Sequence, residues 1–426
     1  MATQPRMRST AVGTGWRAAA FEAEMAARRA SYARPMRLGL FAGTWNVNGQ
    51  SPEVAENLHH WLFPAHTPPP GFDLYMIGLQ EIQSLSGVDA VRADVTRGRD
   101  WRLCMDKVLS RNEYELVAER QLVGILILVY VKTVHRPFLS DVGVSYAGTG
   151  FLNALGNKGG VAARFRLAVA AAEKTTAFLA RRPNGEDSFE QQQPTIAKTA
   201  SGLSQGAAWI GSVASAAAIV LADVQAGANS TALADPNAIS VLDHDAVFWL
   251  GDLNYRVVES SERVINLIEK KDWSSLCDAD QLCNQMQVCD AFGGFREGPI
   301  CFAPTYKLER FKDMYSRDEN GDLKRTPAYT DRILWRRGFP NALQASRPEI
   351  DLVHYSSAPT VLCSDHRPVS ATFAMKFFVD DPVERAQVAK AVHAELDIRE
   401  AELRPSIRIS RAQPFRLGSV CVLNKG

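Results

Sequence analysis

Hydrophobic and polar positions along the chain follow a pattern typical of a protein that mixes strands with helices. Short apolar runs bounded by glycine or polar residues predict buried strands. These strands are expected at 38–43, 74–79, 122–131, 161–167 and 246–250. Between them, 52–62 predicts a short helix, 259–271 a helix with one apolar face, and 381–403 a charged helix. The pattern therefore indicates a mixed α/β fold.

Three of the predicted strands end abruptly in polar side chains. One leads into Asp252 and Asn254, a second into Asn46 and a third into Glu81. Ligands of α/β sheets bind at the carboxyl ends of strands, and Mg²⁺ needs only one or two protein carboxylates because it keeps several waters. We expect these side chains to share one rim. The alternative is a strand-end turn in which Asp252 and Asn254 bond to local backbone.

Basic residues beside glycine or aromatic residues mark candidate anion-binding segments. Lys158 lies in the glycine-rich loop 150–160, whose backbone N–H groups can approach a phosphate, although such loops are common. Basic and aromatic residues also alternate in 302–307 and 324–335, which suits a multiply charged small anion better than a nucleic-acid track. The candidate contacts from these two segments are Tyr306, Lys307, Lys324, Arg325 and Arg332.

One further candidate is the adjacent pair Asp365 and His366, in the segment 364–369. A carboxylate beside an imidazole can raise its pKa and keep the ring cationic against a phosphoryl group. A solitary pair of this kind is more often structural, so the pair alone does not identify a site.

Composition excludes several classes of protein. With 48 Lys and Arg against 47 Asp and Glu, the net charge is +1, so no global field attracts nucleic acid or an acidic membrane. The seven cysteines are scattered without the paired spacing of a zinc site, which indicates free thiols in a reducing compartment. The length of 426 residues suffices for one large α/β domain with appendages, or for two domains.

Seven sequence blocks, taken in order, resemble the inositol polyphosphate 5-phosphatase family. They are TWNVNG at 44–49, LQE at 79–81, GNKGGVAARF at 156–165, FWLGDLNYR at 248–256, FAPTYK at 302–307, RTPAYTDRILWR at 325–336 and SDHRPVSATF at 364–373. The joint occurrence of ordered blocks makes this resemblance specific.

The resemblance implies a two-sheet α/β sandwich with flanking helices, of the DNase I-like kind. It also implies Mg²⁺-dependent removal of the 5-phosphate from phosphoinositides, such as phosphatidylinositol 4,5-bisphosphate, or from soluble inositol polyphosphates. In the implied site, Glu81 with Asn46 holds the metal, Asp252 activates the water and Asn254 orients the water or the phosphate. His366 stabilises charge on the phosphoryl group, and Asp365 fixes that imidazole or the metal. Lys158 and the five contacts from 302–335 bind the phosphates, the ring 4-phosphate above all.

The segment 169–240 departs from the family pattern. Relatives carry a strand ending in a Ser-His-Leu motif whose histidine contacts the scissile phosphate, but no histidine occurs here between His135 and His244. We interpret the segment as an atypical low-complexity insert or replacement. The expected consequences are a sheet without one core strand, irregular structure over much of 180–240 and weakened hydrolysis. The uncharged run 199–222 is too rich in Ala, Gly and Ser for a confident membrane helix.

The two ends of the chain lie outside the catalytic domain predicted at 37–378. Residues 1–36 predict a helical extension, packed beside the domain or serving as an amphipathic transit peptide. Residues 379–426 predict a helix and a tail that resembles the start of a truncated β-sandwich module. We expect a cytoplasmic protein that associates transiently with membrane surfaces.

Three functions stay open at this point. The first is an inositol polyphosphate 5-phosphatase, the second a catalytically impaired phosphoinositide-binding protein, and the third a nuclease or sphingomyelinase of the same superfold. Basic residues beside aromatic ones favour inositol phosphates over nucleic acid, whereas the missing histidine favours the impaired protein.

Overall fold

The computed structural model describes the parts of the chain that form most of the expected elements. These parts are 12–55, 57–68, 71–84, 94–109, 113–148, 159–167, 215–222, 240–288, 291–338 and 348–403. Residues 33–381 form one unit, and 1–32 with 382–426 form a second. The larger unit begins four residues before the boundary predicted at 37, because its first strand starts at Ala33.

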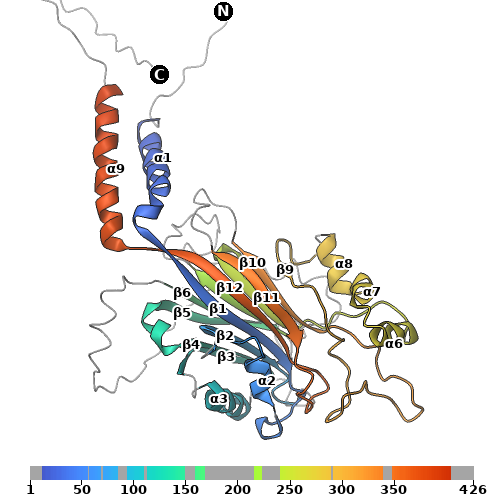
Figure 1. Cartoon of the computed structure of the whole chain (residues 1–426). Helices are drawn as coiled ribbons and strands as arrows, with labels where there is room; N and C mark the ends of the chain where they lie inside the picture. The colour runs from blue at the N-terminus through green and yellow to red at the C-terminus, as the bar shows by residue number, and fades with distance from the viewer. Residues whose placement is uncertain are drawn as a thin grey trace, which may run out of the picture. The chain divides into compact units, whose positions relative to one another are not determined.

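The described strands of the larger unit form two six-stranded sheets (Figure 1). The first sheet has the order β11-β12-β1-β2-β4-β3. Its members are β1 (Ala33–Asn46), β2 (Leu74–Gln80), β3 (Tyr114–Leu122), β4 (Ile125–Lys132), β11 (Glu349–Ser357) and β12 (Val369–Asp380). The second sheet has the order β5-β6-β7-β8-β10-β9. Its members are β5 (Leu139–Gly148), β6 (Gly159–Leu167), β7 (Ser215–Ala222), β8 (Ala246–Asp252), β9 (Arg296–Glu297) and β10 (Asp331–Arg337).

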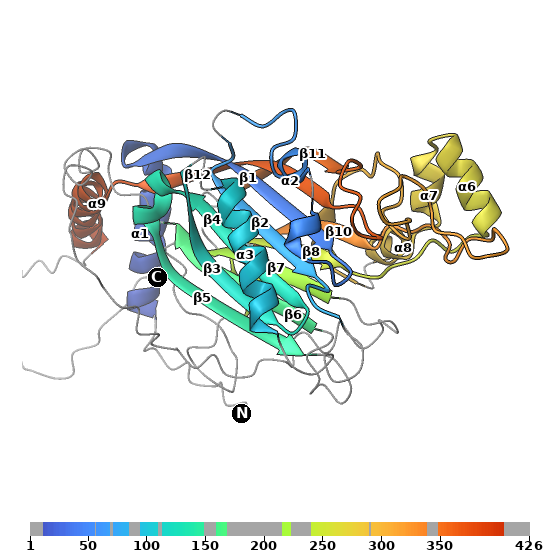
Figure 2. The ribbon, with the colours of Figure 1, turned by 90° about the horizontal axis from the view of Figure 1, so that it is seen from below.

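Helices accompany both sheets. Helices α2 (Leu58–Leu62) and α3 (Val95–Leu109) lie over the outer face of the first sheet (Figure 2). Helices α6 (Ser261–Glu269), α7 (Trp273–Asp278) and α8 (Gln281–Gln287) follow β8 in the chain. Short 3₁₀ turns stand at Arg29–Ser31, Pro52–Val54, Thr133–Phe138 and Val241–Asp243. The helix predicted at 259–271 is confirmed, whereas 52–62 holds a 3₁₀ turn and a separate short helix.

The central strands are apolar without interruption because both of their faces are buried. In β1, Leu40 and Ala42 join the core between the two sheets. Their neighbours Phe41 and Trp45 join a second core beneath α2 and α3. Alternate side chains of a strand point to opposite faces, so a strand covered on both sides reads as a continuous apolar run. Within each sheet the pairing register aligns neighbouring strands: β1 ends beside β2, and β8 ends beside the start of β10.

Strand β7 corrects the expectation that a core strand is missing. It pairs with β6 in parallel and with β8 in antiparallel orientation, so the position beside β6 is filled. The strand comes from the end of the Ala-rich run, whose small and β-branched residues a sheet interior accepts. The rest of 180–240 before residue 240, including Arg181 and Arg182, lies outside the described residues.

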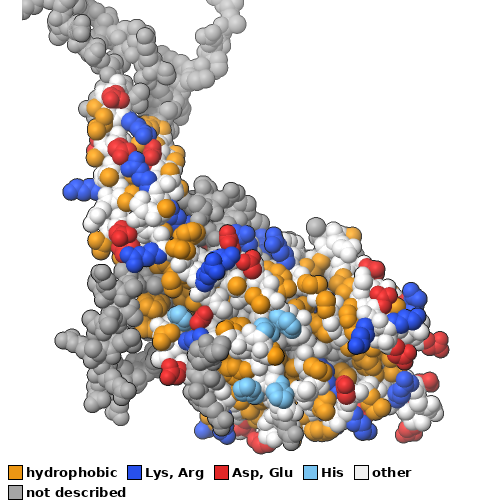
Figure 3. Space-filling model, viewed as in Figure 1, with side chains coloured by type: hydrophobic (Ala, Val, Ile, Leu, Met, Phe, Trp, Pro, Cys, Tyr) orange, Lys and Arg blue, Asp and Glu red, His pale blue; other side chains and the backbone are white. Residues whose placement is uncertain are grey.

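Helices α1 (Val12–Ala27) and α9 (Pro382–Leu403) form the second unit together. Arg17 lies 2.5 Å from both Asp397 and Glu400, and Arg28 lies 2.6 Å from Glu395. Figure 3 shows acidic, basic and hydrophobic side chains close together on this helix pair. The helix predicted at 381–403 is confirmed, and the predicted β-sandwich start at 405–410 lies outside the described residues.

Candidate active site

Four of the predicted site residues stand at one edge of the sandwich: Asn46, Asp252, Asp365 and His366. Strands β1 and β2 run in parallel and end together, with Asn46 opposite Gln80. Strand β8 ends at Asp252, which stands opposite Asp331 at the start of the antiparallel strand β10. Asp365 and His366 lie in the turn before β12. This turn is at the same edge, because β12 runs antiparallel to β1 and its first residue, Val369, pairs with Thr44 near the end of β1.

Both oxygens of Asp252 accept hydrogen bonds. Asn46 Nδ2 donates to Asp252 Oδ2 at 2.9 Å, and the backbone N–H of Asn254 donates to Oδ1 at 3.0 Å. Asn254 has a φ of 59°, in the left-handed region that asparagine tolerates better than most residues. The turn therefore holds Asp252 and Asn254 together. The sequence posed a local turn and a shared rim as alternatives, and Asp252 shows both: it bonds to the backbone of Asn254 and to the side chain of Asn46 on another strand.

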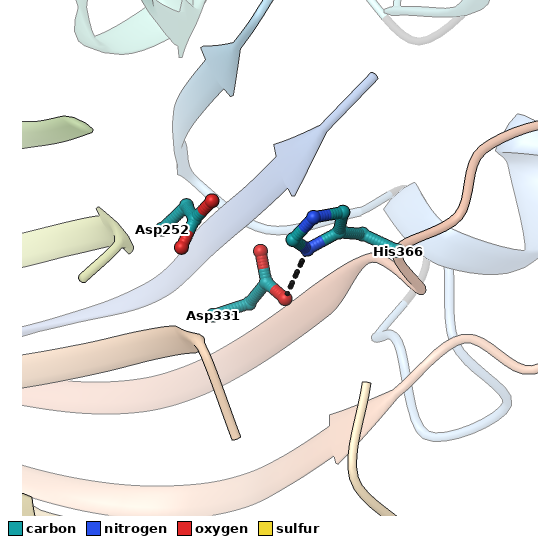
Figure 4. A group of neighbouring side chains, drawn as sticks. All are labelled: Asp252, Asp331 and His366. Carbon is teal, nitrogen blue, oxygen red and sulfur yellow. Dashed lines mark hydrogen bonds and ion pairs between the residues drawn. The ribbon is translucent and has the colours of Figure 1, made fainter. Parts of the chain in front are cut away.

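His366 is held by Asp331. Its Nδ1 lies 2.9 Å from Asp331 Oδ2 (Figure 4). Thr305 Oγ1 donates to the same oxygen at 2.7 Å. Asp252 lies on the other side of Asp331 (Figure 4), and one ligand-type atom from each of the three residues lies within 4.8 Å of the others. Asp365 was expected to fix that imidazole or the metal. The structure shows Asp331 in contact with the imidazole, and Asp365 contacts Lys307.

The charges of this cluster shift two pKa values. Burial lowers the pKa of His366, but the charges of Asp331, Asp252 and Asp365 outweigh it and raise the pKa to about 10. Burial raises the pKa of Asp252 to about 6, and the charges of Asp331 and Glu81 add to this rise against the opposing charge of His366. The site at neutral pH thus contains a cationic imidazole and several carboxylates.

Tyr306 and Lys307 lie against the cluster. The ring of Tyr306 lies against that of His366 with centroids 4.5 Å apart. The Arg256 guanidinium lies over the Tyr306 ring, 4.9 Å from its centroid. Lys307 Nζ lies 2.7 Å from Asp365 Oδ2. Burial raises the pKa of Asp365, but the charge of His366 and the contact with Lys307 hold it below its usual range. Lysine, tyrosine and histidine thus form one wall beside the carboxylates.

Arg332 does not line this wall, which corrects its predicted role. Its side chain is fully buried and pairs with Asp280 at 2.8 Å and Glu297 at 2.6 Å. Arg332 follows Asp331 in a strand, so its side chain points to the opposite face. The guanidinium therefore joins β10 to α8 and β9 and does not reach a ligand.

The other predicted anion contacts have different settings. Lys324 and Arg325 are exposed, and the backbone of Lys324 donates to Ser316, whose own N–H donates to Lys307. This backbone pairing brings Lys324 near the Lys307 wall. Lys158 lies outside the described residues.

Comparison with known proteins identifies the family. Residues 43–372 match the model of endonuclease/exonuclease/phosphatase family 2. The chain belongs to the endonuclease/exonuclease/phosphatase family. It is 32% identical to human synaptojanin-1 over 399 residues, which cover 85% of this chain and 23% of that protein. It is 31% identical to the mouse type II inositol 1,4,5-trisphosphate 5-phosphatase over 377 residues, which cover 88% of this chain and 33% of that protein. The chain thus spans about a quarter to a third of these curated relatives.

A solved structure supports the same family. The inositol polyphosphate 5-phosphatase domain of a synaptojanin, crystallised with inositol (1,4)-bisphosphate and calcium ion, matches with a TM-score of 0.63 and 26% identity. The match covers 90% of this chain and 98% of that domain. The predicted resemblance to inositol polyphosphate 5-phosphatases and the predicted DNase I-like sandwich are therefore confirmed.

The donor set of this endonuclease/exonuclease/phosphatase member fits a hard divalent cation. Glu81 is half-buried, and its charge contributes to the raised pKa of Asp252. Buried oxygens of Asp331 and Asp365 have no hydrogen-bond partner within the described residues. Such an excess of carboxylate oxygen is what Mg²⁺ or Ca²⁺ compensates. His366 is unsuited as a ligand, because its Nδ1 is engaged by Asp331 and the ring is cationic.

Three residues of the cluster were missed by sequence reasoning. Asp331 and Thr305 lie inside family blocks, but no spacing rule links them to His366. Arg256 donates to Asn254 Oδ1, a contact between residues two apart that the sequence alone does not reveal. The available signal for Asp331 was its position inside the block RTPAYTDRILWR, next to the basic residues that were chosen as candidate contacts.

Proposed function

We propose that the chain is a Mg²⁺-dependent phosphomonoesterase that removes the 5-phosphate from inositol phosphates. The observation that carries this proposal is the convergence of Asn46, Asp252, Asp331 and His366 on one sandwich edge, in a fold similar to a domain crystallised with an inositol bisphosphate. Phosphatidylinositol 4,5-bisphosphate and soluble inositol polyphosphates carry the same headgroup chemistry, and both are candidate substrates. We place this activity in the cytoplasm, with transient association with membrane surfaces.

Asp252 prepares the attacking water. Its carboxylate, fixed by Asn46 and by the backbone of Asn254, accepts a proton from a water poised opposite the scissile phosphorus–oxygen bond. The Asn254 amide, engaged by Arg256, orients this water or a phosphoryl oxygen. Phosphoryl transfer needs such in-line positioning more than covalent help.

Cationic groups bind the charge that develops on the phosphoryl group. His366, kept protonated by Asp331, donates toward a phosphoryl oxygen. Glu81 and Asn46 would hold Mg²⁺, which neutralises charge on the phosphate when bound. Lys307, with Lys324 and Arg325 beyond it, would bind the ring 4-phosphate.

The segment without a histidine bears on the rate. Strand β7 fills the sheet, and its first residue, Ser215, stands opposite Asp252. Although β7 completes the strand pairing of the sheet, its sequence contains no histidine. The imidazole that donates a hydrogen bond to the scissile phosphate in the relatives therefore has no counterpart in this strand. Loss of one such donor lowers a rate by roughly 10²- to 10³-fold. We therefore propose an active but weakened enzyme.

Phosphate release from inositol 1,4,5-trisphosphate, measured with Mg²⁺ and with a chelator, tests this function. We expect release only with the metal and only from the 5-position, identified by the product inositol 1,4-bisphosphate. Binding of the trisphosphate without any turnover would instead support the impaired binding protein. None of the helices within the described stretches is long and apolar enough to cross a membrane.

A further inference from the structure

The hairpin that follows Lys307 presents two large apolar side chains to solvent. Leu308 pairs with Tyr315, and the backbone N–H of Glu309 donates to Met314 at 2.8 Å, which closes the turn. Within this turn the exposed fraction is 59% for Phe311 and 52% for Met314. We call residues 309–314 the apolar tip. A folded chain gains nothing by itself from holding two such side chains in water.

The backbone of the apolar tip is strained at Phe311. Its φ is 63°, in the left-handed region that bulky residues rarely adopt. The neighbouring structure imposes this conformation, because Phe311 N–H donates to Leu362 O and the buried Arg367 donates to Lys312 O, both at 2.6 Å. Strain of this kind persists where surrounding contacts over-determine the backbone, and it is concentrated at functional positions. The fold thus keeps an aromatic side chain exposed at a conformational cost.

The residues on either side of Phe311 are cationic, although the apolar tip as a whole carries two basic and two acidic side chains. Arg310 and Lys312 flank Phe311 directly, and both are exposed. Of the two acids in the tip, Glu309 accepts a hydrogen bond from Ser316, and Asp313 lies 3.9 Å from Arg367. An exposed aromatic between two cations matches the interface of a bilayer that contains anionic lipids, where rings enter the headgroup level and each nearby cation adds attraction.

The apolar tip is tied directly to the candidate active site. Leu308 N–H donates to Asp365 O at 2.9 Å, so the strand leading to the tip is bonded to the residue that precedes His366. Arg367, which holds the tip through Lys312, is the residue after His366. A surface that engages the tip therefore engages the same rigid segment that carries His366.

We propose that the apolar tip is a membrane-docking element that inserts Phe311 and Met314 into the interface of an anionic bilayer. This inference rests on the proposed function in one respect, since docking would present lipid-embedded substrate to the Lys307 wall. The occupant is a bilayer and not a protein groove, because the tip is a convex turn with cations beside its aromatic residue.

Sedimentation with vesicles of phosphatidylcholine and phosphatidylserine tests the docking without any hydrolysis. The main variant is Phe311→Gly, because glycine accepts a φ of 63° without strain. We expect its vesicle partition coefficient to fall about tenfold, the scale of losing one buried aromatic side chain. We also expect its melting temperature to be equal to or above that of the parent, which a structural role for Phe311 would not give.

Two further variants serve as matched controls. Val353→Ser removes an apolar side chain with the same 59% exposure from β11 and should bind vesicles as the parent does. The double variant Arg310→Glu with Lys312→Glu should lose binding to phosphatidylserine vesicles while keeping the low binding to pure phosphatidylcholine. Parental binding by Phe311→Gly, or an equal loss in Val353→Ser, would overturn the proposal.

Turnover separates this inference from the proposed function. Phe311→Gly should lower hydrolysis of vesicle-embedded phosphatidylinositol 4,5-bisphosphate relative to soluble inositol 1,4,5-trisphosphate. If the parent hydrolyses neither substrate but the sedimentation pattern holds, the proposed function fails and the docking element stands. If the parent hydrolyses both and never sediments with vesicles, the docking element fails alone.

Discussion

Replacing Asp331 by asparagine tests the electrostatic core of the site. The substitution keeps the shape of the side chain and removes the charge that faces His366 Nδ1 at 2.9 Å. The difference between the pKa of about 10 for His366 and its ordinary value of 6.5 corresponds to on the order of 5 kcal/mol of net stabilisation of the imidazolium. Asp331 supplies the largest favourable part, ahead of Asp252 and Asp365. We expect Asp331→Asn to lower the pKa of His366 by about 1–3 units, the usual effect of one opposite charge in contact.

The pKa of His366 can be measured by NMR titration of histidine-labelled protein in the presence of a chelator. Its signal is assigned from its loss in His366→Gln, since the chain has 8 histidines. Asp365→Asn is the matched control and should lower the pKa less. The charge of Asp365 raises the pKa of His366 less than the charge of Asp331 does, and Asp365 also contacts Lys307. The alkaline limb of the hydrolysis rate should move to lower pH in Asp331→Asn. An unchanged pKa in this variant, or a larger fall in Asp365→Asn, would refute the assignment of Asp331 as the partner of His366.

Four other outcomes follow from the same structure. Glu81→Gln or Asp252→Ala should abolish hydrolysis with an unchanged circular dichroism spectrum, and near-parental turnover in either would remove that residue from its role. Lys307→Ala should raise the Michaelis constant for a 4,5-bisphosphate more than for a ligand without the 4-phosphate, at a cost of about 1.5–3 kcal/mol in binding. Arg332→Met should lower the free energy of unfolding in urea by about 3–5 kcal/mol, because two buried carboxylates lose their partner, and a loss below about 1 kcal/mol would contradict the buried pairing. Because the pKa of His366 is raised on folding, its stabilisation is complete below pH 6.5 and is lost as the pH rises through about 10, which urea unfolding at several pH values measures in the parent and in His366→Gln.

Sequence blocks identified the edge of the sheet but not the contacts within it. Asn46, Asp252 and His366 were predicted to lie together, and the structure brings them to one edge. Asp365, the neighbour of His366 in sequence, was predicted to fix that imidazole or the metal, whereas the side chain that contacts the imidazole is Asp331. Asp365 and His366 lie in a bend before β12, and there the tertiary contacts, not sequence proximity, determine which carboxylate meets the imidazole. Arg332 was placed in the pocket for its charge, and strand alternation instead directs it into a buried ion pair.

By itself the sequence determined the class of fold and the identity of the strand ends. Uninterrupted apolar runs specify strands buried on both faces, and the ordered blocks carry the family, because both are local features of the chain. Only the tertiary structure decided that the Ala-rich run supplies β7, since a weakly apolar segment becomes a strand when two neighbours offer it hydrogen bonds. The tertiary structure also decided that Phe311 stays exposed, because contacts from Leu362 and Arg367, about 50 residues away in the chain, hold its backbone in place.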